Sequence, residues 1–215
     1  MSHPTARGAE CSTEERKQDM SRPSIAAERT EQIMGATRAC LLQYGLAGTT
    51  LERVALESGL SRSHVRYFVG NREDLLRLFA DWLFVGFESG MDDLMSATEP
   101  PQRLSAVIDY LFGTGFLPIS DDDAAVRELI TAGLNDEKLR DMLQSRYNQA
   151  LGLIAGAVRD SIPGVTAKQA RTLAYGIWSL ALGNSTLAEI GLPEASGPTP
   201  RWAVEALVAA MTPRA

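Results

Sequence analysis

Apolar residues recur at a helical period along most of the chain. In the first such stretch, positions i, i+3, i+4, i+7, i+8 and i+11 are held by Ile33, Ala36, Thr37, Cys40, Leu41 and Tyr44. This spacing places them on one face of a helix, and Gly45 is expected to end it. No segment shows the strict alternation that is typical of a half-buried strand. The pattern therefore predicts an all-α fold of about nine helices.

Capping residues and glycines indicate where these helices begin and end. Thr49 or Thr50 can cap a short helix that Gly59 ends. Ser61 can cap the next helix, and Asn71 then opens a long one. From there onward we expect helices at about 72–95, 100–116, 121–134, 136–160, 166–190 and 200–212.

Two of the short helices form a candidate helix-turn-helix between about Thr50 and Phe68. Gly59 allows the positive φ of a tight turn between them, and Leu60 can fill the space where the helices meet. Within the second helix, Val65 is expected to face inward, together with Phe68 or the valine after it. The remaining side chains of that helix are then free to contact a ligand.

These free side chains are rich in hydrogen-bond donors. They are Arg62, Ser63, His64, Arg66 and Tyr67. Donors near the N-terminal end of a helix suit base edges and phosphates in a major groove, and either arginine can contact guanine through two hydrogen bonds. The alternative interpretation is a solvated face of an ordinary helical bundle, because helix-turn-helix spacing alone is a weak indication.

The charge distribution restricts DNA binding to the N-terminal part. The 215 residues have a net charge of −6. Residues 1–80 carry 11 Lys and Arg against 10 Asp and Glu, a net of +1, whereas residues 81–215 carry 10 against 17, a net of −7. Residues 1–24 are polar with almost no apolar side chains, which predicts a disordered arm. We expect a DNA-binding domain at 25–70 and a regulatory domain at 71–215.

Composition argues against several other classes of protein. The two cysteines form neither a disulfide framework nor a zinc site, so a reduced, cytoplasmic setting is expected. Apolar runs are interrupted before about 18 residues, so no membrane span is expected. We also expect no catalytic residues, no metal ligands and no cofactor, because no catalytic triad, phosphate loop or His/Cys cluster occurs. An enzyme is the alternative from another class, since Asp121–Asp123 can bind a cation, although carboxylates at a helix start more often serve the helix dipole.

The segments around the helix-turn-helix resemble the DNA-binding domain of the TetR (tetracycline-repressor) family. The matching pieces are RTEQIMGATRACLLQYG, TTLERVALESGLSRSHV and GNREDLL, in this order within residues 25–78. In that family a threonine opens the second helix, the third helix reads the groove, and a Lys or Arg early in the fourth holds a phosphate. The resemblance assigns these roles to Thr50, to Ser61 through Tyr67, and to Arg72. The predicted DNA-contacting residues are Thr50, Arg53, Ser61, Arg62, Ser63, His64, Arg66, Tyr67 and Arg72.

Two positions depart from the family pattern. The family usually has a tyrosine where this chain has Arg66, and an aromatic residue where it has Val69. That tyrosine normally contacts a phosphate, so Arg66 can either hold a phosphate by charge or read a base. Either role would alter the preferred operator. A helical sensing or protein-binding module that has lost DNA binding is therefore a second alternative.

The resemblance also implies a ligand pocket in the C-terminal helices. Aromatic candidates on the corresponding helices are Trp82, Phe84, Phe87, Tyr110, Phe112, Phe116, Tyr147 and Trp178. From these, the predicted ligand-binding residues are Trp82, Phe87, Phe112, Tyr147 and Trp178. The aromatic content and the acidic balance are also compatible with a cationic ligand.

The helix expected at 166–190 is apolar around much of its circumference. Such a helix must be buried, either within its own domain or against a partner chain. The resemblance favours a homodimer through the helices at 166–190 and 200–212, which also suits two half-sites one turn of DNA apart. The expected function is a ligand-responsive, sequence-specific regulator of transcription that binds double-stranded DNA. In the family's commoner mode it is a repressor, released from its operator by a small, mostly apolar molecule.

Overall fold

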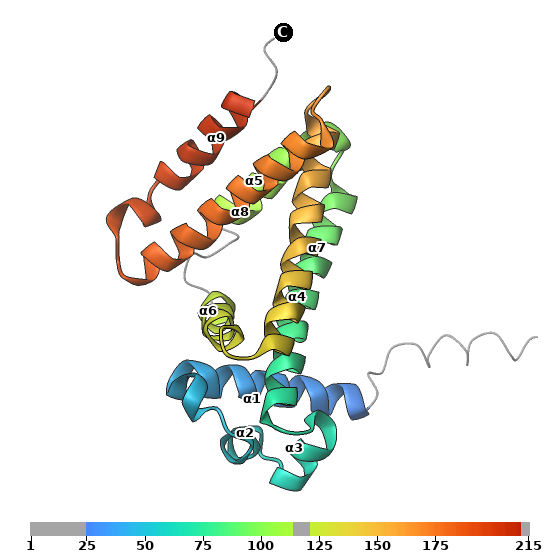
Figure 1. Ribbon diagram of the computed structural model, residues 1–215, viewed down its shortest axis with the longest axis vertical. Coiled ribbons are helices and arrows are strands. Elements are labelled where there is room, and N and C mark those ends of the chain that lie inside the picture. Colours follow the sequence, from blue (N-terminus) through green and yellow to red (C-terminus); the bar gives the residue numbers. More distant parts are fainter. Residues whose placement is uncertain (1–24, 114–120, 212–215) are drawn as a thin grey trace, which may run out of the picture.

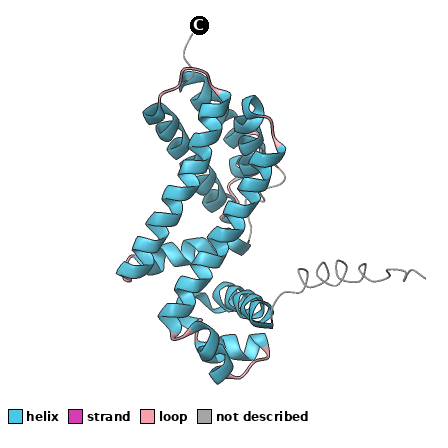
Figure 2. Ribbon diagram, turned by 90° about the vertical axis from the view of Figure 1, so that its right-hand side faces the viewer, coloured by secondary structure: helices cyan, strands magenta, loops and turns pink. Residues whose placement is uncertain are grey.

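The computed structural model describes residues 25–113 and 121–211, and in these ranges helices are joined only by turns and short loops (Figure 2). In chain order the elements are α1 (Ile25–Gly48), α2 (Leu51–Ser58), α3 (Arg62–Val69), α4 (Arg72–Ala97), η1 (Pro100–Gln102), α5 (Arg103–Phe112), α6 (Asp121–Gly133), α7 (Glu137–Ser161), α8 (Ala167–Glu189), η2 (Pro193–Ser196) and α9 (Thr199–Met211). The nine α-helices in these ranges confirm the all-α prediction. The arm predicted at 1–24 and the helix end predicted at Phe116 lie outside the described residues.

The turn between α1 and α2 is set by a glycine and two threonines. Gly45 has φ 65° and ψ −178°, which interrupts the helical geometry three residues before α1 ends. Thr50 caps α2, because its side chain accepts a hydrogen bond from the Arg53 backbone N–H. Thr49 is instead fully buried, and its hydroxyl donates to the Gly45 carbonyl at 3.0 Å. Of the two threonines that the sequence allowed as caps, the structure uses the second.

The turn between α2 and α3 forms as the sequence predicts. Gly59 has φ 67° and lies in the left-handed region. The Ser61 side chain caps α3 by accepting from the His64 backbone N–H at 3.2 Å. Val65 and Val69 are buried against α1 and α2, and Phe68 packs at the edge of the same cluster. This packing orients the other face of α3 toward solvent.

A capping box connects α3 to the long helix α4. The Asn71 side chain accepts from the Asp74 backbone N–H, and the Asp74 carboxylate accepts from the Asn71 backbone N–H. The second of these bonds, aided by Arg77, holds the pKa of Asp74 below its usual range. Because this cap fixes where α4 begins, it also fixes the direction in which α4 leaves the three N-terminal helices.

Two apolar clusters form the core, and α4 and α7 belong to both. The first joins α1, α2 and α3 to α4, α6 and α7, and it contains the fully buried Phe79. The second joins α4 and α7 to α5, α8 and α9, and it contains the fully buried Ile177. Helices α4 and α7 run side by side through the molecule, with α1–α3 at one end and α8 and α9 toward the other (Figure 1). The three N-terminal helices therefore share a core with the rest of the chain.

An ion pair network holds α7 to α4. The Arg146 guanidinium on α7 binds the carboxylates of Asp81 and Glu88 on α4. These partners raise the pKa of Arg146, chiefly through the Asp81 hydrogen bond. No helix within residues 25–113 and 121–211 combines the length and apolar character that crossing a bilayer requires.

Candidate nucleic-acid interface and ligand pocket

The solvent face of α3 and its cap presents a continuous polar surface. Its residues are all exposed, and they are Ser61, Arg62, Ser63, His64, Arg66 and Tyr67. Tyr67 is 82% exposed although it is aromatic, and its ring forms a T-shaped pair with Phe68 at a centroid distance of 5.2 Å. Its ring and hydroxyl are therefore accessible to another molecule.

The two arginines of α3 differ in their surroundings. Arg62 makes an ion pair with Glu52 on α2, with a distance of 2.7 Å from Nε to Oε1. The Arg66 guanidinium has no hydrogen-bond or ion-pair partner among the described residues. Binding of phosphate or guanine by Arg62 must compete with Glu52, whereas Arg66 can bind without giving up an internal contact.

Arg53 and Arg72, two further predicted DNA contacts, hold the turn between α1 and α2. Arg53 donates to the Gly48 carbonyl at 2.8 Å and lies 4.5 Å above the centre of the Tyr44 ring. Arg72 donates through Nε to the Thr49 carbonyl at 2.9 Å and through Nη2 to the Leu46 carbonyl at 2.5 Å. Arg72 therefore supports the turn that presents α2, a role the sequence did not indicate.

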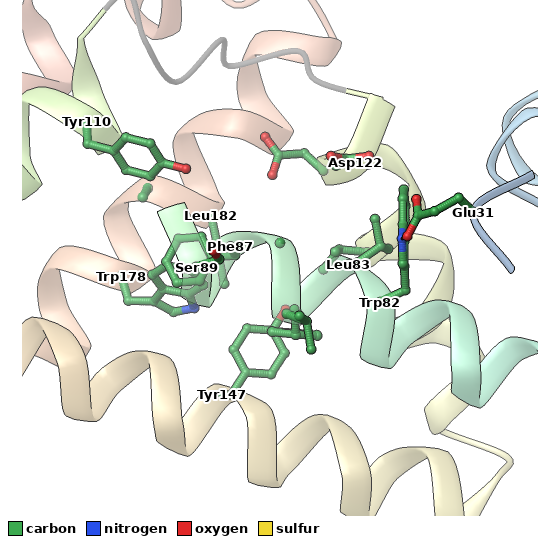
Figure 3. A pocket seen from close by; sticks show the side chains of 16 residues that line it. Glu31, Trp82, Leu83, Phe87, Ser89, Tyr110, Asp122, Tyr147, Trp178 and Leu182 are labelled. Carbon is green, nitrogen blue, oxygen red and sulfur yellow. The ribbon is translucent and has the colours of Figure 1, made fainter. Parts of the chain in front are cut away.

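A cavity of about 670 Å³ lies between α1, α4, α5, α6, α7 and α8. This volume is within the range of small-molecule sites. Four of the five predicted ligand-binding residues line it, namely Trp82, Phe87, Tyr147 and Trp178. In Figure 3 the Trp178, Phe87, Tyr110 and Tyr147 side chains lie on one side of the cavity, and Trp82 and Glu31 on the other.

Phe112, the fifth predicted residue, does not line the cavity but packs against the second core cluster. Tyr110 lines it instead. Residues that are two positions apart in a helix differ by about 200° around its axis, so these two rings point in nearly opposite directions. The residue of α5 that reaches the cavity is therefore Tyr110 and not Phe112.

Four aromatic rings of the cavity contact one another in a chain. The centroid of Trp178 lies 5.0 Å from that of Phe87 and 6.1 Å from that of Tyr147. Phe87 is also 6.3 Å from Tyr110. These distances are typical of favourable ring pairs, so the wall is held in shape by its own side chains.

Two buried polar atoms in this wall have no hydrogen-bond partner among the described residues. They are the Trp178 Nε1 and the Tyr147 hydroxyl. Burial raises the pKa of Tyr147 to about 12, and the nearby Asp123 carboxylate adds to the shift. The phenol is therefore protonated at neutral pH and can donate a hydrogen bond to a molecule in the cavity.

Helix α1 takes part directly in the cavity. The Glu31 carboxylate on α1 lines the cavity and accepts a hydrogen bond from Trp82 Nε1 at 2.8 Å. Arg38, two turns further along α1, makes a 2.8 Å ion pair with Asp122 on α6, and Asp122 also lines the cavity. Two contacts thus join the wall of the cavity to the helix that supports α2 and α3. Neither contact was predicted from the sequence.

No group of three or more His, Cys, Asp or Glu side chains in the described part of the chain is arranged to hold a metal ion. Helix α6 does begin at Asp121, as the run of carboxylates predicts. The next two carboxylates have partners within the protein, since Asp122 pairs with Arg38 and Asp123 accepts from the Ser185 hydroxyl at 3.1 Å.

The arrangement of the helices matches that of known regulators. A TetR transcription regulator from Haloarcula marismortui superposes with a TM-score of 0.73 at 24% identity, covering 86% of this chain and 98% of that one. The chain has the TetR-family fold. No protein-family model matches the sequence.

Two further regulators are similar to this chain, one in fold and one in sequence. A transcriptional regulator from Saccharomonospora viridis, solved in complex with choline, gives a TM-score of 0.67 at 18% identity and covers 85% of this chain and 96% of that one. The HTH-type transcriptional regulator YfiR of Bacillus subtilis is 27% identical over 125 residues, which are 56% of this chain. The match spans 59% of the length of YfiR.

Proposed function

We propose that this chain is a sequence-specific DNA-binding regulator of transcription whose affinity for its operator depends on a small molecule in the cavity. Residues 25–70 would bind DNA, and residues 71–215 would bind the ligand and a second copy of the chain. The observation that carries the proposal is that one chain combines an exposed donor-rich helix, α3, with a cavity whose wall includes Glu31 from the same three-helix unit.

The α3 surface supports DNA binding through its chemistry. Arginine, hydroxyl and imidazole side chains on adjacent turns can bind both phosphates and base edges. Arg66 is free to do either, and the Thr50 and Ser61 hydroxyls lie at the N-terminal ends of α2 and α3, where phosphate oxygens are favoured. The TetR-family fold and the likeness to YfiR support the same role.

The contacts of α1 with the cavity support ligand dependence. A ligand that alters the Trp82–Glu31 or Arg38–Asp122 contact would change how α1–α3 sit against α4 and α6. If it binds one arrangement more tightly, it shifts the population toward that arrangement and away from the spacing that DNA requires. Release from the operator would make the protein a repressor. The choline complex of the S. viridis regulator supports a small-molecule occupant.

A homodimer through α8 and α9 would provide two α3 surfaces. The exposed side of α8 includes the apolar residues Tyr175 and Leu187, and the exposed Ile190 follows directly after the helix. Trp202 on the adjacent α9 is 63% exposed. The small residues of α8 serve the monomer in part, because a Cβ at Gly176 would lie 2.6 Å from the Leu207 side chain on α9. This exposed apolar surface of α8 and α9 is the face that a second copy would cover.

Gel-shift titration with the DNA that flanks its own gene tests DNA binding. We expect specific binding that weakens steeply as salt rises, because phosphate contacts release counterions. Arg66→Ala should weaken binding about tenfold or more, whereas Arg159→Ala, an exposed arginine on α7, should not. A folded protein that binds neither flanking nor selected DNA would contradict the proposal and favour a sensing module without DNA binding.

Sedimentation analysis tests the dimer. Trp202→Glu should produce monomers, while the matched change Leu134→Glu, at a position 70% exposed in the loop after α6, should leave dimers intact. Dimers that survive changes at both Trp202 and Tyr175 would exclude the α8–α9 face.

A further inference from the structure

We propose that the cavity binds a small organic cation that also carries a neutral hydrogen-bond acceptor. The inference deepens the proposed function, since it takes the cavity as the effector site. It depends on four features of the wall: its carboxylates, its aromatic faces, the position of Arg38, and two buried donors without a partner.

The charges on the wall have one sign. Glu31, Asp122 and Asp123 line the cavity, and none of the other described residues that line it is Lys, Arg or His. Arg127, which shares the Ser185 hydroxyl with Asp123, does not line the cavity and is itself paired with Glu189. An anion in this space would be repelled, and a neutral molecule would gain at most hydrogen bonds from the carboxylates. A cation gains from all three.

The aromatic faces favour the same charge. Phe87, Tyr110, Tyr147 and Trp178 form a continuous wall on one side of the cavity (Figure 3). The face of an aromatic ring attracts a positive charge, most strongly for tryptophan and when water is excluded. The wall thus offers a cation both ring faces and carboxylates, and its apolar surface suits the carbon groups of an alkylated amine.

Arg38 shows that groups at the edge of the cavity already bind a cation. Its guanidinium lies 5.6 Å from the centre of the Trp82 ring and 2.8 Å from the Asp122 carboxylate. Trp82 and Asp122 both line the cavity, whereas Arg38 does not. A ligand cation would therefore compete with Arg38 for the same ring and carboxylate, and it would loosen a contact between α1 and α6.

The two unpartnered polar atoms define the rest of the ligand. Trp178 is 9% exposed, and its indole N–H can only donate. The Tyr147 hydroxyl is also buried without a partner. A buried donor without an acceptor destabilises the protein, so an acceptor on the ligand would be stabilising. This acceptor is a neutral oxygen, such as a hydroxyl, ether or carbonyl, because an anionic one would meet the Asp123 carboxylate.

Two probes of nearly identical shape separate charge from size. Calorimetric titration of the full-length protein would compare 3-hydroxyphenyltrimethylammonium with 3-tert-butylphenol, which replaces the charged nitrogen by carbon. We expect the cation to bind about tenfold more tightly or better. Equal affinity, tighter binding of the neutral phenol, or no binding of either at millimolar concentration would overturn the proposal, because a cavity of about 670 Å³ has room for both.

Substitutions in the wall then test the assigned groups. Asp123→Asn should weaken the cation about fivefold or more and leave the neutral phenol unchanged, and the control Asp93→Asn, at an exposed carboxylate of α4 outside the cavity, should change neither. Trp178→Phe keeps a ring but removes the N–H. It should weaken 3-hydroxyphenyltrimethylammonium more than phenyltrimethylammonium, which has no oxygen.

These binding measurements use no DNA. Suppose that the neutral phenol binds as well as the cation in a protein that still binds operator DNA in the gel-shift assay. In that case the inference about the ligand fails and the proposed function stands. If the cation binds as expected and no DNA is bound, the proposed function fails and the cavity remains a cation site.

Discussion

The α3 surface and the cavity draw their residues from the chain in different ways. The α3 surface comes from consecutive residues, Ser61 to Tyr67, whose placement follows from one cap and two buried valines. The cavity takes side chains from six helices between Glu31 and Leu182. A surface built from adjacent residues can change one side chain at a time without loss of stability. A cavity built from distant segments depends on the core that brings them together.

Phe79→Ala should have the largest effect, because it removes a fully buried ring from the cluster that α1–α3 share with α4, α6 and α7. We expect the free energy of unfolding in urea to fall by about 3–5 kcal/mol, and ligand binding to weaken because Phe79 stacks on Trp82 of the cavity. Tyr67→Ala, on the α3 surface, should change stability by about 0.5 kcal/mol or less. If Phe79→Ala lowers the free energy of unfolding by as little as Tyr67→Ala does, α1–α3 do not share a core with α4, α6 and α7.

Arg72→Ala tests whether Arg72 belongs to the reading surface or to the scaffold. The loss of its hydrogen bonds to the Leu46 and Thr49 carbonyls should lower the free energy of unfolding by about 1–3 kcal/mol. Arg72→Lys keeps the positive charge but cannot make both hydrogen bonds. Compared with Arg72→Ala, it should therefore restore the salt dependence of DNA binding more fully than it restores the free energy of unfolding. Unchanged stability with a flatter salt slope would instead assign Arg72 to a phosphate alone.

Trp82→Phe should have a smaller effect on stability, because it removes one hydrogen bond to a partly exposed carboxylate. We expect a loss of about 1 kcal/mol, together with a weaker effect of 3-hydroxyphenyltrimethylammonium on operator affinity. Glu31→Leu removes the acceptor and is the matched change from the other side of the bond. If each variant keeps the full effect of the probe on DNA binding, this contact does not transmit the response.

Arg38→Gln should have the smallest effect on stability, about 0–1 kcal/mol, because the Arg38–Asp122 pair is partly exposed. Its expected signature is an increase of about threefold in affinity for the cationic probe, since one competitor for Asp122 is removed. Arg140→Gln, at an exposed position of α7, is the control. Weaker binding of the cation by Arg38→Gln would show that Arg38 and the ligand do not compete.

The same contrast explains what could be predicted from the sequence. Helix periodicity and caps depend on residues within a few positions of one another, so the helices of the described residues, the turn at Gly59 and the helix start at Asn71 were all predictable. The exposed face of α3 followed from the inward position of Val65. For Arg72, the sequence indicated a charge near the DNA-binding helices, but the carbonyl groups it binds lie 23 and 26 residues earlier in the chain.

The cavity was only partly predictable because it depends on how distant helices are rotated. The aromatic residues selected on α4, α7 and α8 belong to helices that line the cavity. The choice between Tyr110 and Phe112 required the orientation of α5. Glu31 carried no signal, since an exposed glutamate on the first helix is typical of a solvated face. Its role follows from the approach of α4 to α1, which brings Trp82 within hydrogen-bond distance.

The position of Glu31 has a consequence for how such proteins can be recombined. A chimaera that joins residues 1–70 of another chain to residues 71–215 of this one would lose a carboxylate from the cavity wall, together with the acceptor for Trp82. With the proposed function, the hybrid would recognise new DNA, but its ligand preference would also change. A faithful exchange of DNA specificity would transplant α2 and α3 alone and keep the native α1.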